Sequence, residues 1–258
     1  MELFDSGGDG PEVLFLHGAL VDRTLWDPVI ARLPGRRCLA PTLPLGSHRT
    51  PVPDRSRLTP VGVADTIADL IAEQGLTDLT VVASDTGGAV LQLLLARRPD
   101  GIARVVFTPC DALEVFPPAL FKPLFTLGRS PHLLAAFLSP LRVPNAWRLP
   151  IGFGWLTKRA SNATVAGWTA PALSDFEIVK DGAQFLRGCD PSLLLDAAPK
   201  LRAFEGEAIF CWPSDDRCFP VELGRRLAAQ FRSSRFVEID DSYSFVSIDR
   251  PDALAALI

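Results

Sequence analysis

Short apolar runs rich in β-branched residues alternate along the chain with longer segments whose apolar residues recur at helical spacing. The apolar runs are bounded by turn residues and predict strands at residues 12–18, 36–41, 79–84, 103–109, 207–213 and 234–240. Helical patterns lie between several of these runs. Because strands that alternate with helices pair in parallel through crossover connections, the pattern predicts an α/β fold with a mostly parallel central sheet flanked by helices.

Two of the predicted helices have informative ends. Residues 59–75 start with Thr59, a favoured N-cap residue, and Pro60 fits the first helical position. Residues 87–99 carry apolar side chains around nearly the whole helix and stop at Pro99. We therefore expect the second helix to be buried.

The pattern changes between residues 111 and 200. Strand patterns disappear, prolines become frequent, and large aromatic residues accumulate until the alternation resumes at Glu207. The aromatic residues are Phe116, Phe121, Phe125, Trp147, Phe153, Trp155, Trp168 and Phe176. We interpret residues 111–200 as an inserted helical cap over a core formed by residues 1–110 and 201–258.

Composition narrows the possible partners. The 258 residues include 48% hydrophobic and 22% charged residues, as in ordinary globular proteins, and the net charge of −4 gives no support for binding nucleic acid. No apolar run approaches the roughly 18 residues that span a bilayer, and the first residues lack the pattern of a signal peptide, so we expect a cytoplasmic protein without a membrane partner. A monomer and a homodimer are both compatible with the sequence.

The cysteines point to neither disulfides nor a metal site. The chain has five of them, and they are scattered, without CxxC or Cys/His spacing. We expect reduced, mostly buried thiols, no metal and no cofactor.

The segment VVASDTGGAV, residues 81–90, contains the most informative motif. A predicted strand runs directly into small residues and then into a helix, and a reactive side chain on such a tight turn needs small neighbours because the backbone passes close by. Ala83, Gly87 and Gly88 provide that space around Asp85. The alternative interpretation is that Asp85 only caps the following helix.

This elbow resembles that of the α/β-hydrolase family, and in particular the haloalkane dehalogenases and soluble epoxide hydrolases, whose elbow carries an aspartate. The segment FLHGAL, residues 15–20, resembles the family's HG loop, which implies an oxyanion hole formed by the backbone N–H groups of Ala19 and Thr86. In that comparison His17 supports the loop rather than acting as a base.

Two positions fit the family's catalytic acid. CWPSDDRCFP, residues 211–220, resembles the acid loop and selects Asp216, with Asp215 as the fallback. Asp111 follows the strand at 103–109, which is another family location for the acid. Solvation in a surface loop is the alternative for Asp216, and a role in a turn at the start of the cap is the alternative for Asp111.

The family's catalytic histidine has no counterpart in the sequence. The three histidines are His17, His48 and His132, whereas the family's base follows the acid near the end of the chain. Its position falls on Ser244, whose hydroxyl cannot exchange a proton near neutral pH as imidazole does. An ester formed on Asp85 would therefore tend to persist.

Two family signatures are also replaced. Thr86 and Ala19 occupy positions where dehalogenases commonly carry a halide-binding Trp and Asn, and the single tyrosine, Tyr243, lies outside the cap that supplies proton donors in epoxide hydrolases.

The aromatic cap predicts an apolar pocket for a small apolar or aromatic molecule. Trp147, Trp155 and Trp168 are candidate substrate-binding residues, together with His17 and His48 from the core, although cap aromatics also serve as packing. We expect Asp85 to act as an acid or base in isomerisation, elimination, cyclisation or bond cleavage. The alternatives are hydrolysis through a substitute base and a non-catalytic ligand-binding protein.

Overall fold

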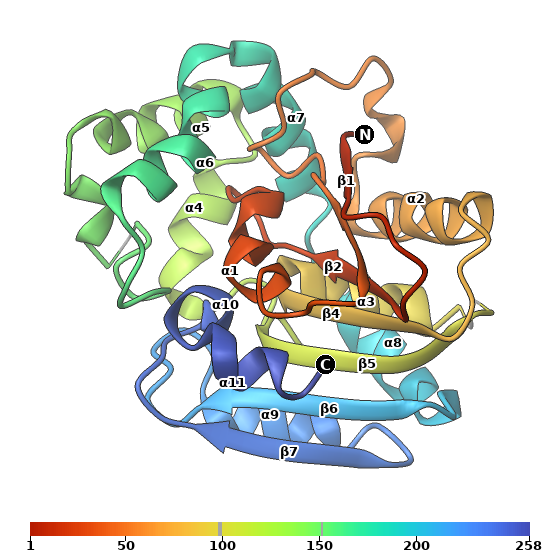
Figure 1. Ribbon diagram of the computed structural model, residues 1–258. Coiled ribbons are helices and arrows are strands. Elements are labelled where there is room, and N and C mark those ends of the chain that lie inside the picture. Colours follow the sequence, from red (N-terminus) through yellow and green to blue (C-terminus); the bar gives the residue numbers. More distant parts are fainter. Residues whose placement is uncertain (98–99, 151) are drawn as a thin grey trace.

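A computed structural model describes residues 1–97, 100–150 and 152–258, and within them the chain forms a seven-stranded sheet in the order β1-β3-β2-β4-β5-β6-β7 (Figure 1). The strands are β1 (Leu3–Asp5), β2 (Glu12–Leu16), β3 (Arg37–Pro41), β4 (Leu79–Asp85), β5 (Ile102–Cys110), β6 (Glu207–Pro213) and β7 (Ser234–Ile239). β1 pairs antiparallel with β3, and every other pairing is parallel. The predicted α/β fold is confirmed.

All six predicted runs form strands, with ends that differ by no more than two residues. β4 lies at the centre of the sheet, and its residues from Leu79 to Ser84 are buried. A strand covered on both faces is apolar without alternation, which is why its sequence is so clear. The sequence pattern does not predict β1, because three residues are too few to show a strand pattern.

Helices cover both faces of the sheet. α2 (Pro60–Glu73), α3 (Thr86–Leu95) and α9 (Val221–Ala228) lie on one face, and α1 (Asp27–Ile30), α10 (Val246–Asp249) and α11 (Pro251–Ala255) lie on the other (Figure 1). α2 starts as predicted, because the Thr59 hydroxyl accepts a hydrogen bond from the Gly62 N–H at 3.0 Å. All ten residues of α3 are buried, as expected from its apolar circumference. The predicted stop at Pro99 lies outside the described residues.

The described part of the segment between β5 and β6 contains helices joined by turns and loops, and most of it gathers over the end of the sheet at which β4 meets α3 (Figure 1). It contains α4 (Lys122–Leu127), α5 (Pro131–Leu138), α6 (Asn162–Ser174), α7 (Phe176–Arg187) and α8 (Pro191–Ala197), with short 3-10 turns between several of them. α8 falls inside the predicted cap range but packs against α3, since its buried residues, Leu194 and Ala197, face the core.

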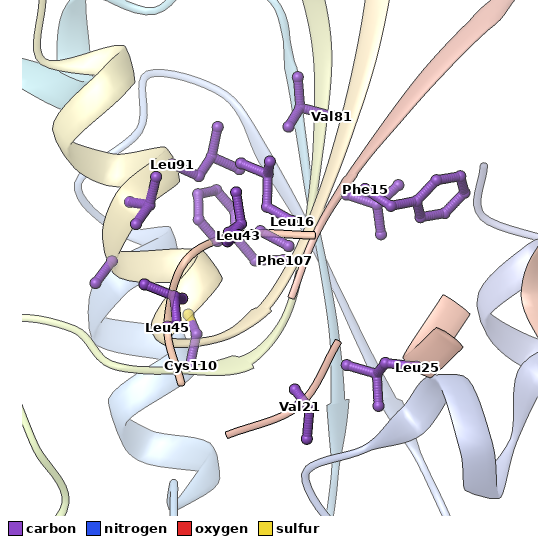
Figure 2. Packing of buried hydrophobic residues seen from close by; sticks show 14 of the residues in the cluster. Phe15, Leu16, Val21, Leu25, Leu43, Leu45, Val81, Leu91, Phe107 and Cys110 are labelled. Carbon is purple, nitrogen blue, oxygen red and sulfur yellow. The ribbon is translucent and has the colours of Figure 1, made fainter. Parts of the chain in front are cut away.

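The main core lies between the sheet and α3. Figure 2 shows Leu16, Leu91 and Phe107 on the α3 side of the sheet, with Phe15 and Leu25 on the other side. Phe15 and Leu16 face opposite ways because successive strand side chains alternate. Among the described helices, none has the length and apolar composition that crossing a bilayer requires.

Candidate active site

Asp85 stands on a strained turn. It is the last residue of β4, the next residue starts α3, and its φ of 53° and ψ of −132° lie in a region that residues other than glycine rarely adopt. Holding one residue there costs about 1–3 kcal/mol, so the surrounding structure must fix it. In the described chain its carboxyl makes no capping hydrogen bond to α3, which speaks against the interpretation of Asp85 as a simple cap.

The glycines around Asp85 are required by close contacts. A Cβ added at Gly18 would lie 2.1 Å from Asp85 Oδ2, one at Gly87 would lie 2.3 Å from the Leu16 carbonyl oxygen, and one at Gly88 would lie 2.3 Å from Cys110 Cβ. No real side chain tolerates such distances. The strand, the HG loop and the following strand therefore close around this turn only because these positions are glycine.

Asp85 faces a small apolar pocket of about 50 Å³. The core contributes Ala19, Leu20, Asp85 and Thr86, and the helical segment contributes Pro118, Phe121, Leu124, Phe125, Phe137, Leu138, Leu141, Gly152, Phe153 and Leu156. The exposed part of the Asp85 side chain therefore faces apolar side chains. Ala19 and Thr86, the predicted oxyanion pair, both line the pocket.

The apolar surroundings make Asp85 a weaker acid. Burial raises its pKa from 3.8 to about 7, the backbone N–H of Thr86 opposes the rise, and the charge of Asp216 adds to it. Near neutral pH, Asp85 is therefore divided between its protonated and ionised forms.

Asp216 is close enough for its charge to act on Asp85, and its own pKa is raised in the same way. Burial raises its pKa to about 7, against hydrogen bonds that stabilise the carboxylate. Its Oδ1 accepts from the N–H groups of Phe219 at 2.5 Å and Cys218 at 2.8 Å, whereas Oδ2 has no partner among the described residues. Asp215 points outward and pairs with Lys158 at 2.6 Å.

Ser244, which the sequence predicts at the position of the family's histidine, is fully buried near Asp216. Its hydroxyl is close enough to lower the pKa of Asp216, but it does not have the geometry of a hydrogen bond, and Oγ finds no partner in the described structure. Two polar oxygens, Ser244 Oγ and Asp216 Oδ2, are therefore buried and unpartnered in the described structure.

Asp111 joins the cluster from the loop after β5. The Thr86 hydroxyl donates to its Oδ2 at 3.1 Å, and burial together with the charge of Asp85 raises its pKa well above the usual value. The structure thus brings together three of the aspartates selected from the sequence, two of which flank Asp85. Among the described residues, no group of His, Cys, Asp and Glu has the arrangement of a metal site.

The histidines lie away from this cluster or are fully engaged. His17 Nδ1–H donates to the Gly18 carbonyl at 2.8 Å, and its Nε2 accepts from the Leu43 N–H at 2.8 Å. Burial lowers the pKa of His17 to about 4, so it is a neutral support for the loop that carries Ala19. His48 pairs with Asp181 of α7 beside a different cavity, and His132 is exposed against Phe176.

The three tryptophans proposed for substrate binding lie elsewhere in the described structure. The indole N–H of Trp147 donates to Asn162 at 2.6 Å, that of Trp168 donates to Thr24 at 2.9 Å, and Trp155 packs under the Arg217 guanidinium.

Phenylalanines and leucines form the pocket walls instead. Phe121, Phe125 and Phe153 were among the cap aromatics noted in the sequence, whereas Leu20 and Phe137 were not singled out. The position of Leu20 directly after the HG loop is the signal that could have indicated it.

Comparison with known proteins agrees with this fold. The model of the alpha/beta hydrolase family matches residues 13–257. A haloalkane dehalogenase of Mesorhizobium japonicum is 33% identical over 139 residues, which cover 50% of this chain and 44% of that protein, less than half of its length. Haloalkane dehalogenase 2 of Mycobacterium tuberculosis is 27% identical over 270 residues, which cover 97% of this chain and 87% of that protein.

A solved structure of a haloalkane dehalogenase from Bradyrhizobium elkani superposes with a TM-score of 0.78 at 20% identity and covers 98% of this chain and 94% of that one. At that identity the likeness shows a shared fold. The family match spans nearly the whole chain, and the protein is therefore an enzyme of the alpha/beta hydrolase family, similar to its haloalkane dehalogenases.

Proposed function

We propose that this enzyme performs acid/base chemistry on a small apolar molecule, with Asp85 and Asp216 exchanging the proton. The observation that supports it is the buried Asp85 carboxyl at an apolar pocket, with its pKa raised to about 7, together with the buried Asp216 carboxyl, whose charge acts on Asp85 and whose pKa is also raised to about 7. A catalytic group works best as both acid and base when its pKa lies near the working pH. Neither carboxyl needs a histidine for this role.

The pair favours a state with one proton. Two negative charges close together in a poorly solvated place repel each other, so ionisation of one carboxyl opposes ionisation of the other. One group can then accept a proton from the substrate while the other holds one to donate. Isomerisation, elimination, cyclisation and bond cleavage all use such an exchange.

The pocket limits the substrate. Its walls are phenylalanine, leucine and proline side chains, which favour an apolar group, and its volume of about 50 Å³ leaves room for only a small one. In this proposal the N–H groups of Ala19 and Thr86, two residues of the pocket wall, stabilise negative charge on a substrate oxygen.

Proton exchange can be measured with a simple ketone. Cyclohexanone in D₂O exchanges its α-hydrogens when a base removes them, and proton NMR follows the loss of signal. We expect exchange above background with the wild type, and at least about a tenfold lower rate with Asp85→Asn. Asp215→Asn is the matched control, since Asp215 lies next to Asp216 in sequence but pairs outward with Lys158. Equal rates for wild type and Asp85→Asn would refute the proposal.

A second candidate is hydrolysis with Asp216 as a substitute base, and two observations favour it: the unpartnered Asp216 Oδ2 beside Ser244, and the similarity to haloalkane dehalogenases. The Asp85 carboxylate would attack the carbon of a haloalkane, forming an ester as the halide leaves. Asp216 would then take a proton from water, which attacks the ester carbonyl and releases the alcohol.

Intact-protein mass spectrometry with 1-bromobutane separates the candidates. Sustained release of bromide and butanol that depends on Asp85 supports hydrolysis. A butyl adduct that accumulates on Asp85 shows a nucleophile without an effective base, and no reaction counts against the ester route.

Installing the family's base gives a further test of the ester route. We expect Ser244→His to speed the release of such an adduct, because the new imidazole would lie beside Asp216. Ser247→His is the matched control, since Ser247 is also a buried serine with an unpartnered hydroxyl. If both variants release the adduct at the wild-type rate, Ser244 is not at the position of the base.

A further inference from the structure

A second and larger cavity lies apart from Asp85. Its volume is about 490 Å³, and within the described structure it shares no lining residue with the Asp85 pocket. The segment after β3, residues 42–58, forms most of it, and α2 closes one side. Ligand cavities commonly measure about 300–1,000 Å³, so this one is large enough for a small molecule.

The cavity walls are mainly apolar. They include three prolines and the side chains of Val52, Leu58 and Val63, with threonine hydroxyls between them. Pro44, Pro51 and Pro53 are the prolines. Proline rings and branched side chains present hydrocarbon without donors, which favours an apolar body in the ligand.

Two buried polar side chains, Thr42 and His48, line this cavity, and His48 carries the ring nitrogens. His48 has only 7% of its side chain exposed, and its Nε2 lies 3.0 Å from Asp181 Oδ2. Asp181 also accepts from the Val52 N–H at 2.8 Å and from the Arg55 guanidinium, so it acts as an acceptor throughout. Nε2 must therefore carry the proton that it donates to Asp181.

The other ring nitrogen is left as an acceptor. Burial lowers the pKa of His48, so its ring is neutral near pH 7 and Nδ1 carries no proton. Nδ1 is buried and has no partner among the described residues. A buried acceptor without a donor costs about 1–3 kcal/mol, which a ligand that supplies the donor would recover.

The charged residues at the cavity carry both signs, which favours a neutral ligand. Glu2 and Asp54 line it with Arg49, Arg57 and the terminal residue Met1. Arg57 pairs with Asp69 at 2.8 Å, and Arg49 lies 3.6 Å from Asp22, so both guanidinium groups are already compensated. A free carboxylate or phosphate would have to compete with these pairs.

We propose that this cavity is a second ligand site, which binds a neutral, mainly apolar molecule through a hydroxyl group that donates to His48 Nδ1. The site does not depend on the chemistry at Asp85, and failure of either proposal leaves the other standing.

Phenol and anisole test the proposal, because they share a ring and differ in the hydroxyl proton. Titrations followed by ¹H–¹⁵N NMR should show saturable shifts for phenol at residues 42–66, and the Nδ1 resonance of His48 should move on binding. Anisole should bind about tenfold more weakly, the effect of one lost hydrogen bond. Equal affinity for the two probes, or phenol shifts confined to the residues around Asp85, would overturn the proposal.

Blocking variants locate the binding. Two variants place a large side chain in the cavity: Thr66→Phe on α2 and Thr50→Phe in the loop at its exposed edge. Each should weaken phenol binding at least tenfold. Thr77→Phe is the matched control, since Thr77 is an exposed threonine that does not line the cavity. Asp85→Asn should bind phenol at residues 42–66 as the wild type does. Unchanged phenol binding in both blocking variants would contradict the assignment, and the use of two elements guards against a folding defect in one.

Discussion

Replacing Asp85 by asparagine should stabilise the protein at alkaline pH. The side chains have nearly the same shape and size, so the contacts that fix the turn can hold asparagine in the same geometry. What changes is the charge. The pKa of Asp85 is raised from 3.8 to about 7 in the folded protein, so the fold binds this proton more tightly than the unfolded chain does.

The sign of the effect follows from that difference. Below about pH 4 the carboxyl is protonated in both states, and the substitution should leave the free energy of unfolding nearly unchanged. Between about pH 4 and 7 the unfolded chain ionises first, so the wild type loses stability as the pH rises. At pH 8 the loss is at most about 4 kcal/mol, at 1.36 kcal/mol for each unit of pKa, and access to the pocket reduces it. Asp85→Asn removes this loss.

Urea unfolding at pH values from 4 to 8.5, followed by tryptophan fluorescence, measures the prediction. We expect the two curves of unfolding free energy against pH to coincide near pH 4 and to separate by at least about 1 kcal/mol at pH 8, with the variant more stable. Asp215→Asn is the control, because loss of its exposed ion pair with Lys158 should change stability by no more than about 1 kcal/mol. If Asp85→Asn is equally or less stable than the wild type at pH 8, Asp85 does not ionise in an apolar site.

Three further outcomes follow from the same contacts. Gly18→Ala should destabilise the protein by about 1–3 kcal/mol and should abolish Asp85-dependent cyclohexanone exchange, because its Cβ would lie 2.1 Å from Asp85 Oδ2; an active variant of normal stability would show that this contact is not tight. The exchange rate should rise with pH through about 7 as Asp85 ionises, and a rate that is level from pH 5 to 9 would contradict Asp85 as the base. Thr59→Ala should lower the unfolding free energy by about 1 kcal/mol through loss of the cap to Gly62 without changing exchange, and a change in exchange alone would be inconsistent with a purely local role.

Local chemistry made much of the fold predictable from the sequence. The buried strands are continuous apolar runs, Thr59 and Pro60 have the chemistry of a helix start, and the small residues around Asp85 match a cramped turn between a strand and a helix. Each of these features depends on residues that are close together in the chain, so the sequence pattern predicts it without knowledge of the tertiary structure. The lack of a histidine after residue 132 is likewise a fact of the sequence.

Only the tertiary structure decided where the cap and loop side chains point. It placed Asp216 beside Asp85 and turned Asp215 toward Lys158, although the two aspartates are adjacent in sequence. It also lined the Asp85 pocket with phenylalanines, and it placed His48 against Asp181 beside another cavity. The direction of a side chain on a loop or a short helix depends on packing against residues distant in the chain, and a pattern of hydrophobic positions does not contain those contacts.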